Sequence, residues 1–87
     1  MFIRTQDRQE LISDSAFKSI KVDNNGNILG VPFTKNFNYV LGDYKDNVRS
    51  MKVLNEIQRA MQSDYGNILS DSKIKNYSSG VYIMPKE

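Results

Sequence analysis

The 87-residue sequence contains no cysteine, no histidine and no tryptophan, and it has only two prolines. Without cysteine a disulfide framework is impossible, and no redox constraint points to a secreted protein. Without histidine, the commonest general base and the commonest metal ligand are missing. Because structural zinc sites are built from cysteine and histidine, zinc is effectively excluded as well. We therefore expect no catalytic residues, no metal site and no cofactor.

Long apolar runs are also missing. No stretch approaches the roughly 18 apolar residues of a membrane span, and the first residues are too polar for a signal peptide. The net charge is only +2, from 12 basic and 10 acidic residues, which does not by itself indicate nucleic acid binding. These observations favour a single soluble domain, residues 1–87, in the cytoplasm and without a membrane partner.

An alternation of apolar and polar residues around Asn25-Gly26 predicts a β-hairpin. The Asn-Gly pair tolerates the positive φ angles of a two-residue type I′ turn. Folding about it places Val22 opposite Leu29 and Ile20 opposite Val31, so that both apolar pairs share one face. We therefore expect this register.

Shorter patterns add further strands around the hairpin. Pro32 is expected to end its second strand, because proline cannot donate to a sheet ladder. Since the connections are short, antiparallel pairing is expected. Together the patterns predict an α+β fold, in which an antiparallel β-meander of about five strands packs on one amphipathic helix and a final C-terminal strand follows. The other expected strands are 2–6, one around Leu11 and Ile12, 37–41 and 81–84, and residues 63–79 are expected to be mostly loop with a short element at Ile68-Leu69.

The clearest helix runs from about residue 46 to residue 62. Asp46 suits the N-cap, since its carboxylate can accept a hydrogen bond from a free backbone N–H of the first turn. Leu54 and Ile57 are expected to be the most deeply buried residues of the helix. The apolar arc spans roughly 240°, more than one sheet face covers, so residues 63–79, a second subunit or a partner must cover the rest. The apolar band consists of Val48, Met51, Leu54, Ile57 and Met61, with Val53 and Ala60 on its flank.

A narrow basic stripe lies opposite this apolar band. Arg49, Lys52 and Arg59 form it, and they are the candidate partner-binding residues. Glu56 falls within the stripe, where it lowers the local potential and offers intrahelical ion pairs. A solvated helix face without a partner is the alternative interpretation.

The five tyrosines offer a different candidate surface. Every nucleic acid base has a π-face on which an aromatic ring can stack, so tyrosines beside lysines would suit a single strand. These residues are dispersed along the chain, and some occupy positions expected in the core. The residues to consider are Tyr44, Tyr65 and Tyr77, with Lys35, Lys73 and Lys75.

The acidic clusters support neither a catalytic nor a calcium site. Asp7 with Glu10 and Asp43 with Asp46 occur where turns and caps are expected, positions that Asp favours for its bonds to the backbone. The Asn-rich turn of the hairpin superficially resembles a calcium loop, but its twelfth position is Thr34, where such loops require a bidentate glutamate. A divergent carboxylate enzyme is the third hypothesis, behind two kinds of binding protein.

Four segments distributed along the chain are Ile3-Arg4-Thr5-Gln6-Asp7, Leu41-Gly42-Asp43-Tyr44, Val53-Leu54-Asn55-Glu56-Ile57-Gln58 and Met84-Pro85-Lys86-Glu87. Together they resemble an uncharacterised family of small proteins from Gram-positive bacteria and their phages and mobile elements. The resemblance implies a phage or mobile-element setting, and it implies no reaction.

The missing active site and the resemblance favour a non-enzymatic protein-interaction module that binds a host protein or complex. Inhibition of a host defence system such as CRISPR, by steric occlusion, is the specific hypothesis. The alternative is a small nucleic-acid-binding accessory or regulatory protein that uses the basic stripe. Homo-oligomerisation stays open.

Overall fold

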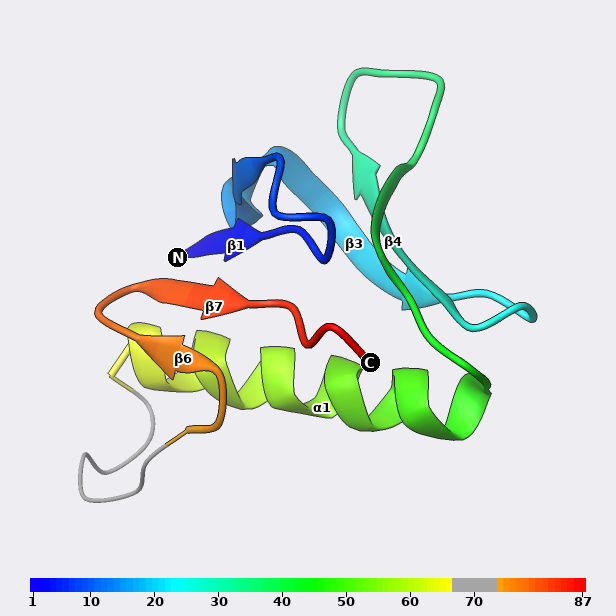
Figure 1. Cartoon of the computed structure of the whole chain (residues 1–87). Helices are drawn as coiled ribbons and strands as arrows, with labels where there is room; N and C mark the ends of the chain where they lie inside the picture. The colour runs from blue at the N-terminus through cyan, green and yellow to red at the C-terminus, as the bar shows by residue number, and fades with distance from the viewer. Residues whose placement is uncertain (67–73) are drawn as a thin grey trace.

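The computed structural model describes residues 1–66 and 74–87, and it shows one α-helix packed against two small sheets (Figure 1). This arrangement confirms the expected α+β class and the final C-terminal strand. Within the described residues, no helix is both long and apolar enough to cross a membrane. The expected short element at Ile68-Leu69 and the candidate Lys73 lie outside the described residues. The elements are β1 (Phe2–Arg4), β2 (Leu11–Ser13), the 3₁₀ turn η1 (Asp14–Ala16), β3 (Phe17–Val22), β4 (Asn27–Pro32), β5 (Tyr39–Asp43), α1 (Asn47–Asp64), β6 (Tyr77–Ser78) and β7 (Val81–Ile83).

Segments from both ends of the chain meet in the four-stranded sheet, whose order is β2-β1-β7-β6. β1 and β7 lie side by side and run parallel, with Ile3 opposite Tyr82 (Figure 1). The expectation of antiparallel pairing is therefore wrong for this pair. Short hairpin connections require antiparallel strands, but α1 and most of the chain lie between β1 and β7, and a long connection permits a parallel pair. The second sheet, β3-β4-β5, is an antiparallel meander, as expected.

The β3–β4 hairpin forms, but its register differs from the expected one by one residue. Val22 pairs with Ile28 rather than with Leu29, and Ile20 pairs with Gly30. Because side chains alternate along a strand, this slip exchanges the two faces of β4. Ile28 is fully buried in the core, whereas Leu29 lies half-buried on the opposite face.

The side chain of Asp23 explains this register. The backbone N–H of Asp23 donates to Asn27 O (3.0 Å). The Asp23 carboxylate accepts the backbone N–H groups of Asn25 and Asn27, at 2.9 Å each. These bonds close a loop of three residues rather than two, and within it only Gly26 has a positive φ, at 84°. A two-residue turn with positive φ at both positions occurs instead at Ser79-Gly80, between β6 and β7.

The expected helix forms as α1, and Asp46 is its N-cap. The Asp46 carboxylate accepts the backbone N–H of Arg49 at 2.9 Å, which satisfies one of the free donors of the first turn. The helix ends at Asp64 rather than near residue 62.

The helix is rotated relative to the expected apolar band. Leu54, expected among the most buried residues, is only half-buried, and Val48 is 68% exposed. Ser50 is buried in their place, because its hydroxyl donates to Gly26 O at 2.6 Å and its polar atom is therefore satisfied inside the core. The buried face consists of Ser50, Val53, Ile57 and Ala60.

One hydrophobic core joins the helix to both sheets. Ile3 and Tyr82 come from the four-stranded sheet, Ile28 and Leu41 from the three-stranded sheet, and Val53 from α1, and each is fully buried. In the described part of the chain, no buried side-chain nitrogen or oxygen lacks a hydrogen-bond partner. The core therefore combines a continuous apolar cluster with satisfied polar groups.

Gly26→Ala should destabilise the domain more than Gly66→Ala. Both glycines have a positive φ, 84° and 77°, and alanine in that region loses roughly 1–2 kcal/mol of backbone energy. At Gly26 an added Cβ would lie 2.5 Å from the backbone oxygen of Tyr44, whereas among the described residues nothing lies within 4 Å at Gly66. Urea unfolding of both variants measures the difference, and equal losses of unfolding free energy would contradict the close packing at the turn.

Candidate functional site

The C-terminal residues 84–87 are held largely by side chains rather than by a strand ladder. The donors come from the β1–β2 loop, from the segment before α1 and from α1 itself, so that distant parts of the chain converge on this segment. The bonds are Arg8 Nη1 to Met84 O (2.6 Å), Tyr44 Oη to Pro85 O (2.7 Å), Gln6 Nε2 to Lys86 O (2.8 Å) and Arg49 Nη2 to Glu87 O (2.7 Å).

Arg49, one of the three candidate partner-binding residues, therefore has a structural role. Its guanidinium donates to Glu87 O from two nitrogens, at 2.7 and 3.0 Å, and lies 5.7 Å from the centre of the Tyr44 ring. Burial raises the pKa of Tyr44 to about 12. Lys52 and Arg59 are exposed to solvent and remain free to contact a partner.

Glu56 does not pair with the basic stripe. Its carboxylate accepts the hydroxyl of Tyr82 at 2.8 Å and the side-chain amide of Asn76 at 3.1 Å. Burial, followed by the bond to Glu56, raises the pKa of Tyr82. The ion pairs found among residues 1–66 and 74–87 both involve the Met1 amino group, so the expected intrahelical pairs of Glu56 are wrong. Glu56 is thus hydrogen-bonded to the four-stranded sheet through Tyr82, and the cations of the basic stripe lack the ion pairs with Glu56 that were expected.

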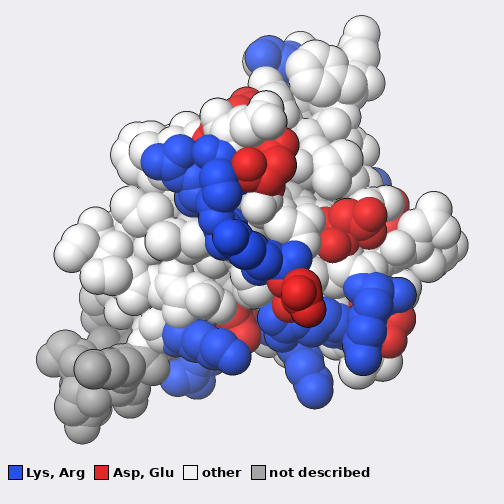
Figure 2. Space-filling view, in the orientation of Figure 1, with Lys and Arg blue, Asp and Glu red and all other residues white. Residues whose placement is uncertain are grey.

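Lys and Arg side chains gather on the face shown in Figure 2, across its middle and along the part occupied by α1. A hollow of about 470 Å³ lies beside the first turn of α1. Its lining carries three cations and two carboxylates, and these charges nearly cancel, so the hollow is not an anion site by charge alone. The lining residues are Asp43, Tyr44, Lys45, Arg49, Lys86 and Glu87.

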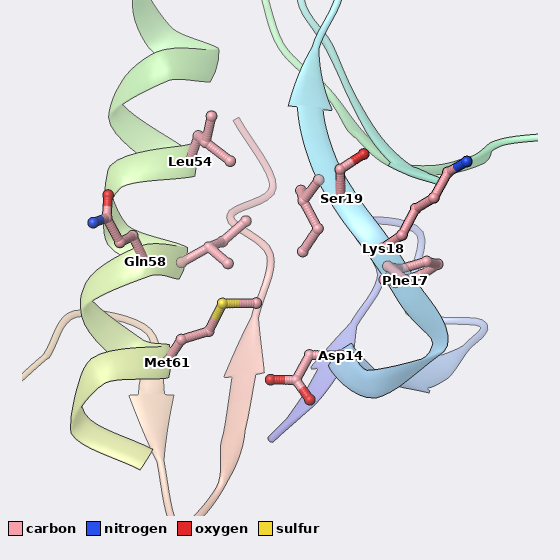
Figure 3. Close-up of a pocket in the computed structure, with 9 residues that line it drawn as sticks. Asp14, Phe17, Lys18, Ser19, Leu54, Gln58 and Met61 are labelled. Atoms are coloured by element: carbon pink, nitrogen blue, oxygen red, sulfur yellow. The ribbon is translucent and has the colours of Figure 1, made fainter. Parts of the chain in front are cut away.

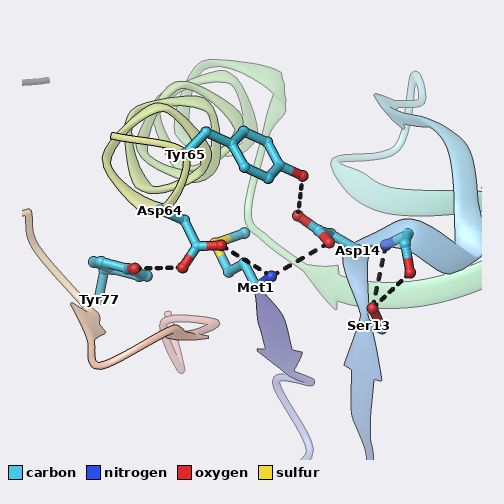
Figure 4. A network of polar contacts seen from close by, with 7 residues as sticks. Met1, Ser13, Asp14, Asp64, Tyr65 and Tyr77 are labelled. Atoms are coloured by element: carbon cyan, nitrogen blue, oxygen red, sulfur yellow. Dashed lines mark hydrogen bonds and ion pairs between the residues drawn. The ribbon is translucent and has the colours of Figure 1, made fainter. Parts of the chain in front are cut away.

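A polar network joins β1, η1, the end of α1 and β6 (Figure 4). The Met1 amino group lies 3.1 Å from Asp64 Oδ2 and 3.5 Å from Asp14 Oδ1. Tyr77 donates to Asp64 at 2.7 Å, and Tyr65 donates to Asp14 at 3.2 Å. The bond from Tyr77, followed by that from the amino group, lowers the pKa of Asp64, and the bond to Asp64 raises the pKa of the amino group. One positive and two negative charges thus meet here, and each carboxylate also accepts a tyrosine hydroxyl, which is typical of a structural role.

The tyrosines do not form one stacking surface. Tyr44 and Tyr82 are buried, and Tyr65 and Tyr77 are bonded to the carboxylates of the polar network. Tyr39 lies apart from them, in the three-stranded sheet. The geometry therefore gives no support to a base-stacking surface made of these residues.

A loop between β4 and β5 projects from the rest of the molecule (Figure 1). We call residues 33–40, which are this loop and the first two residues of β5, the aromatic loop. It exposes three large apolar side chains within a short segment, with exposed fractions of 65% for Phe33, 55% for Phe37 and 57% for Val40. Apolar side chains clustered in this way are typical of a contact surface.

Contacts within the aromatic loop hold its shape. The rings of Phe37 and Tyr39 meet edge to face, with centroids 5.2 Å apart. Lys35 Nζ donates to the Tyr39 hydroxyl at 2.8 Å and lies 5.5 Å from the centre of the Phe37 ring. This surface is not among those predicted from the sequence, because Phe37 is expected in the strand 37–41, whereas β5 begins at Tyr39. The signal that could have found it is the pair of phenylalanines flanking a polar turn.

A groove of about 390 Å³ lies between α1 and β3 (Figure 3). Leu54 and Met61 project into it from the helix. Ile20 lines it from the strand. Asp14 lies at one end of the groove. The groove is thus mainly apolar, and part of the wide apolar arc of α1 faces it.

No protein-family model, no curated protein and no solved structure matches this chain. The functional assignment therefore depends on the surfaces described above.

Tyr44→Phe should lower the free energy of unfolding at pH 8. Between pH 8 and pH 11, however, the variant should lose less unfolding free energy than wild type. The variant loses the bond to Pro85 O, an effect of about 1 kcal/mol. Since the pKa of Tyr44 is raised to about 12 in the folded state, folding favours the neutral phenol. The resulting contribution to the free energy of unfolding is fully present below the unfolded pKa of about 10, and it is lost as the pH rises to about 12. Urea unfolding at pH 8 and pH 11 should therefore show a smaller difference between variant and wild type at pH 11. An unchanged difference would contradict the raised pKa.

Proposed function

We propose that this domain is a non-enzymatic protein-binding module whose main contact surface is the aromatic loop. The observation that carries the proposal is the exposure of Phe33 and Phe37 on a projecting segment that its own contacts keep in shape. Buried aromatic anchors supply much of the energy of protein interfaces, and a preorganised loop loses little entropy on binding. Such a surface supports binding without any chemical step.

Other exposed apolar side chains lie apart in the sequence, on α1 and in the four-stranded sheet, and Val48 and Met51 are those on the helix. Phe2, Leu11 and Ile83 lie in the four-stranded sheet and are 44–47% exposed. Arg4 pairs with both Leu11 and Ile83 and so separates them. Leu11 therefore provides a matched control for substitutions in the aromatic loop.

The partner we propose is a host protein or complex encountered in the cytoplasm, in a phage or mobile-element setting. The support for this setting is the resemblance in the sequence. A domain bound through a projecting loop would inhibit by covering a surface of its partner, which is the steric mechanism proposed for a host-defence inhibitor.

A second candidate function is nucleic acid binding through the basic stripe. The exposure of Lys52 and Arg59 favours it, as does the bonding of Glu56 to the four-stranded sheet. Arg49 is a poor probe of this function, because its substitution would also remove the two bonds to Glu87 O. Binding to phosphates would weaken steeply with salt, since counterions are released.

The double variant Phe33→Ser/Phe37→Ser should remain folded and lose its protein partner. Captured proteins from a lysate of the natural host would be identified, and the one retained by wild type would be purified for titration. We expect at least tenfold weaker binding, about 1.4 kcal/mol, by the double variant and unchanged binding by Leu11→Ser. Equal binding by the folded double variant would contradict the proposal, and a loss confined to Leu11→Ser would move the surface to the four-stranded sheet.

The double variant Lys52→Glu/Arg59→Glu tests the second function. Wild type and variant are titrated with single-stranded and double-stranded DNA and RNA at 50 and 200 mM salt, with fluorescence anisotropy as the measurement. Binding that falls steeply with salt and disappears in the variant would establish the second function. If the protein partner is retained by this variant and no nucleic acid binds, the basic stripe is a solvated helix face.

A further inference from the structure

We propose that the free edge of β3 is a second docking site, which binds an extended segment of a protein partner by strand addition. In this mode the backbone of the bound segment pairs with a sheet edge, and alternate side chains give specificity. The bound segment carries apolar residues at alternate positions and acidic residues between them. The site lies on different residues from the aromatic loop and is therefore independent of it.

The backbone of β3 presents unpaired groups at this edge. β3 is the outer strand of the sheet β3-β4-β5, and among the described residues it pairs only with β4. The bond from Asp23 N to Asn27 O closes the hairpin, and hydrogen-bonded pairs then alternate along the strands. Lys21 is accordingly bonded to β4, whereas the N–H and C=O groups of Ile20 and Val22 point away from it.

Beside this edge lies an apolar surface of suitable shape. The groove of about 390 Å³ between β3 and α1 is lined by Ile20, Leu54 and Met61 (Figure 3). Met51, 46% exposed, lies one turn before Leu54 on the helix and extends the apolar flank. A strand added to β3 would lie about 4.8 Å from it, and its inward side chains would therefore cover this flank of the helix.

The charges of β3 select an acidic segment. Lys18 and Lys21 are both exposed, and Lys21 lies on the face of the sheet opposite to Ile20. Side chains directly opposite across a strand pair attract when their charges differ and repel when they are alike. Among the described residues, the only carboxylate lining the groove is Asp14, which is already bonded to Tyr65 and near the Met1 amino group. Outward glutamates or aspartates on the bound strand would therefore pair with Lys21, while Lys18, at the irregularity between Phe17 and Ser19, adds positive charge at one end of the groove.

The same charges disfavour a second copy of this chain as the occupant. Two β3 strands pairing edge to edge would bring Lys18 and Lys21 of each copy together. Lysines at sheet edges commonly prevent such association. The partner is therefore a different chain, with the acidic pattern described above.

The test uses a capped synthetic peptide, Glu-Val-Glu-Val-Glu-Val-Glu, and a control peptide with lysine in place of each glutamate. Amide hydrogen exchange and NMR titration report on the described edge directly. We expect the acidic peptide to slow exchange at the N–H groups of Ile20 and Val22 and to shift the signals of Leu54. The lysine peptide should do neither.

Charge reversal supplies a matched pair of protein variants. Lys18→Glu/Lys21→Glu should bind the acidic peptide at least tenfold more weakly, whereas Lys52→Glu/Arg59→Glu, with the same change in charge, should bind it like wild type. Phe33→Ser/Phe37→Ser should also bind it like wild type, which separates this site from the aromatic loop.

Three outcomes would overturn the proposal. The first is the absence of protection at Ile20 and Val22 at millimolar acidic peptide. The second is equal binding by the folded Lys18→Glu/Lys21→Glu variant. The third is protection of these N–H groups in the protein alone that increases with protein concentration, which would assign the edge to a second copy.

Discussion

The contact between the β3–β4 turn and the beginning of α1 fixes how the helix lies on the sheets. Ser50 donates its hydroxyl to Gly26 O at 2.6 Å, and Asn47 donates its side-chain amide to Asp23 O at 3.1 Å. The backbone N–H of Tyr44 donates to the same Gly26 oxygen at 3.1 Å. This approach requires a residue without a Cβ at position 26. Because two of the donors lie in the first turns of α1, the helix cannot rotate without breaking these bonds.

The rotation of the helix determines which chemistry each flank presents. With Ser50 inside, one flank turns Leu54 toward β3 and produces the apolar groove. The other flank turns Arg49 toward the C-terminal segment and Glu56 toward Tyr82, where both side chains are engaged. The structure therefore gives an apolar groove on one side and exposed cations on the other, from a helix whose apolar arc is wider than its buried face.

The sequence predicted the features that depend on local chemistry. The α+β class, the helix and the Asp46 N-cap follow from periodicity and capping, which act over a few residues. The buried helix face depends instead on the Ser50 hydroxyl, whose partner Gly26 lies 24 residues away in the sequence. The hairpin register depends on the Asp23 carboxylate, whose bonds to Asn25 and Asn27 are local but compete with the two-residue turn that the Asn-Gly pair indicates. Of the candidate site residues, Lys52 and Arg59 are exposed as expected, whereas the engagement of Arg49 involves a residue distant in the sequence.

The short strands explain why Arg49 is not free. β1, β2 and β7 have three residues each and β6 has two, so the four-stranded sheet has few ladder bonds. A domain of this size also buries a modest fraction of its surface, and it has no disulfide to compensate. Side-chain donors such as Gln6, Arg8 and Arg49 supply the missing bonds, each with a net effect of about 1 kcal/mol. Holding the C-terminal segment beside the four-stranded sheet thus occupies one cation of the stripe, whereas the groove and the aromatic loop are surfaces that the fold leaves exposed.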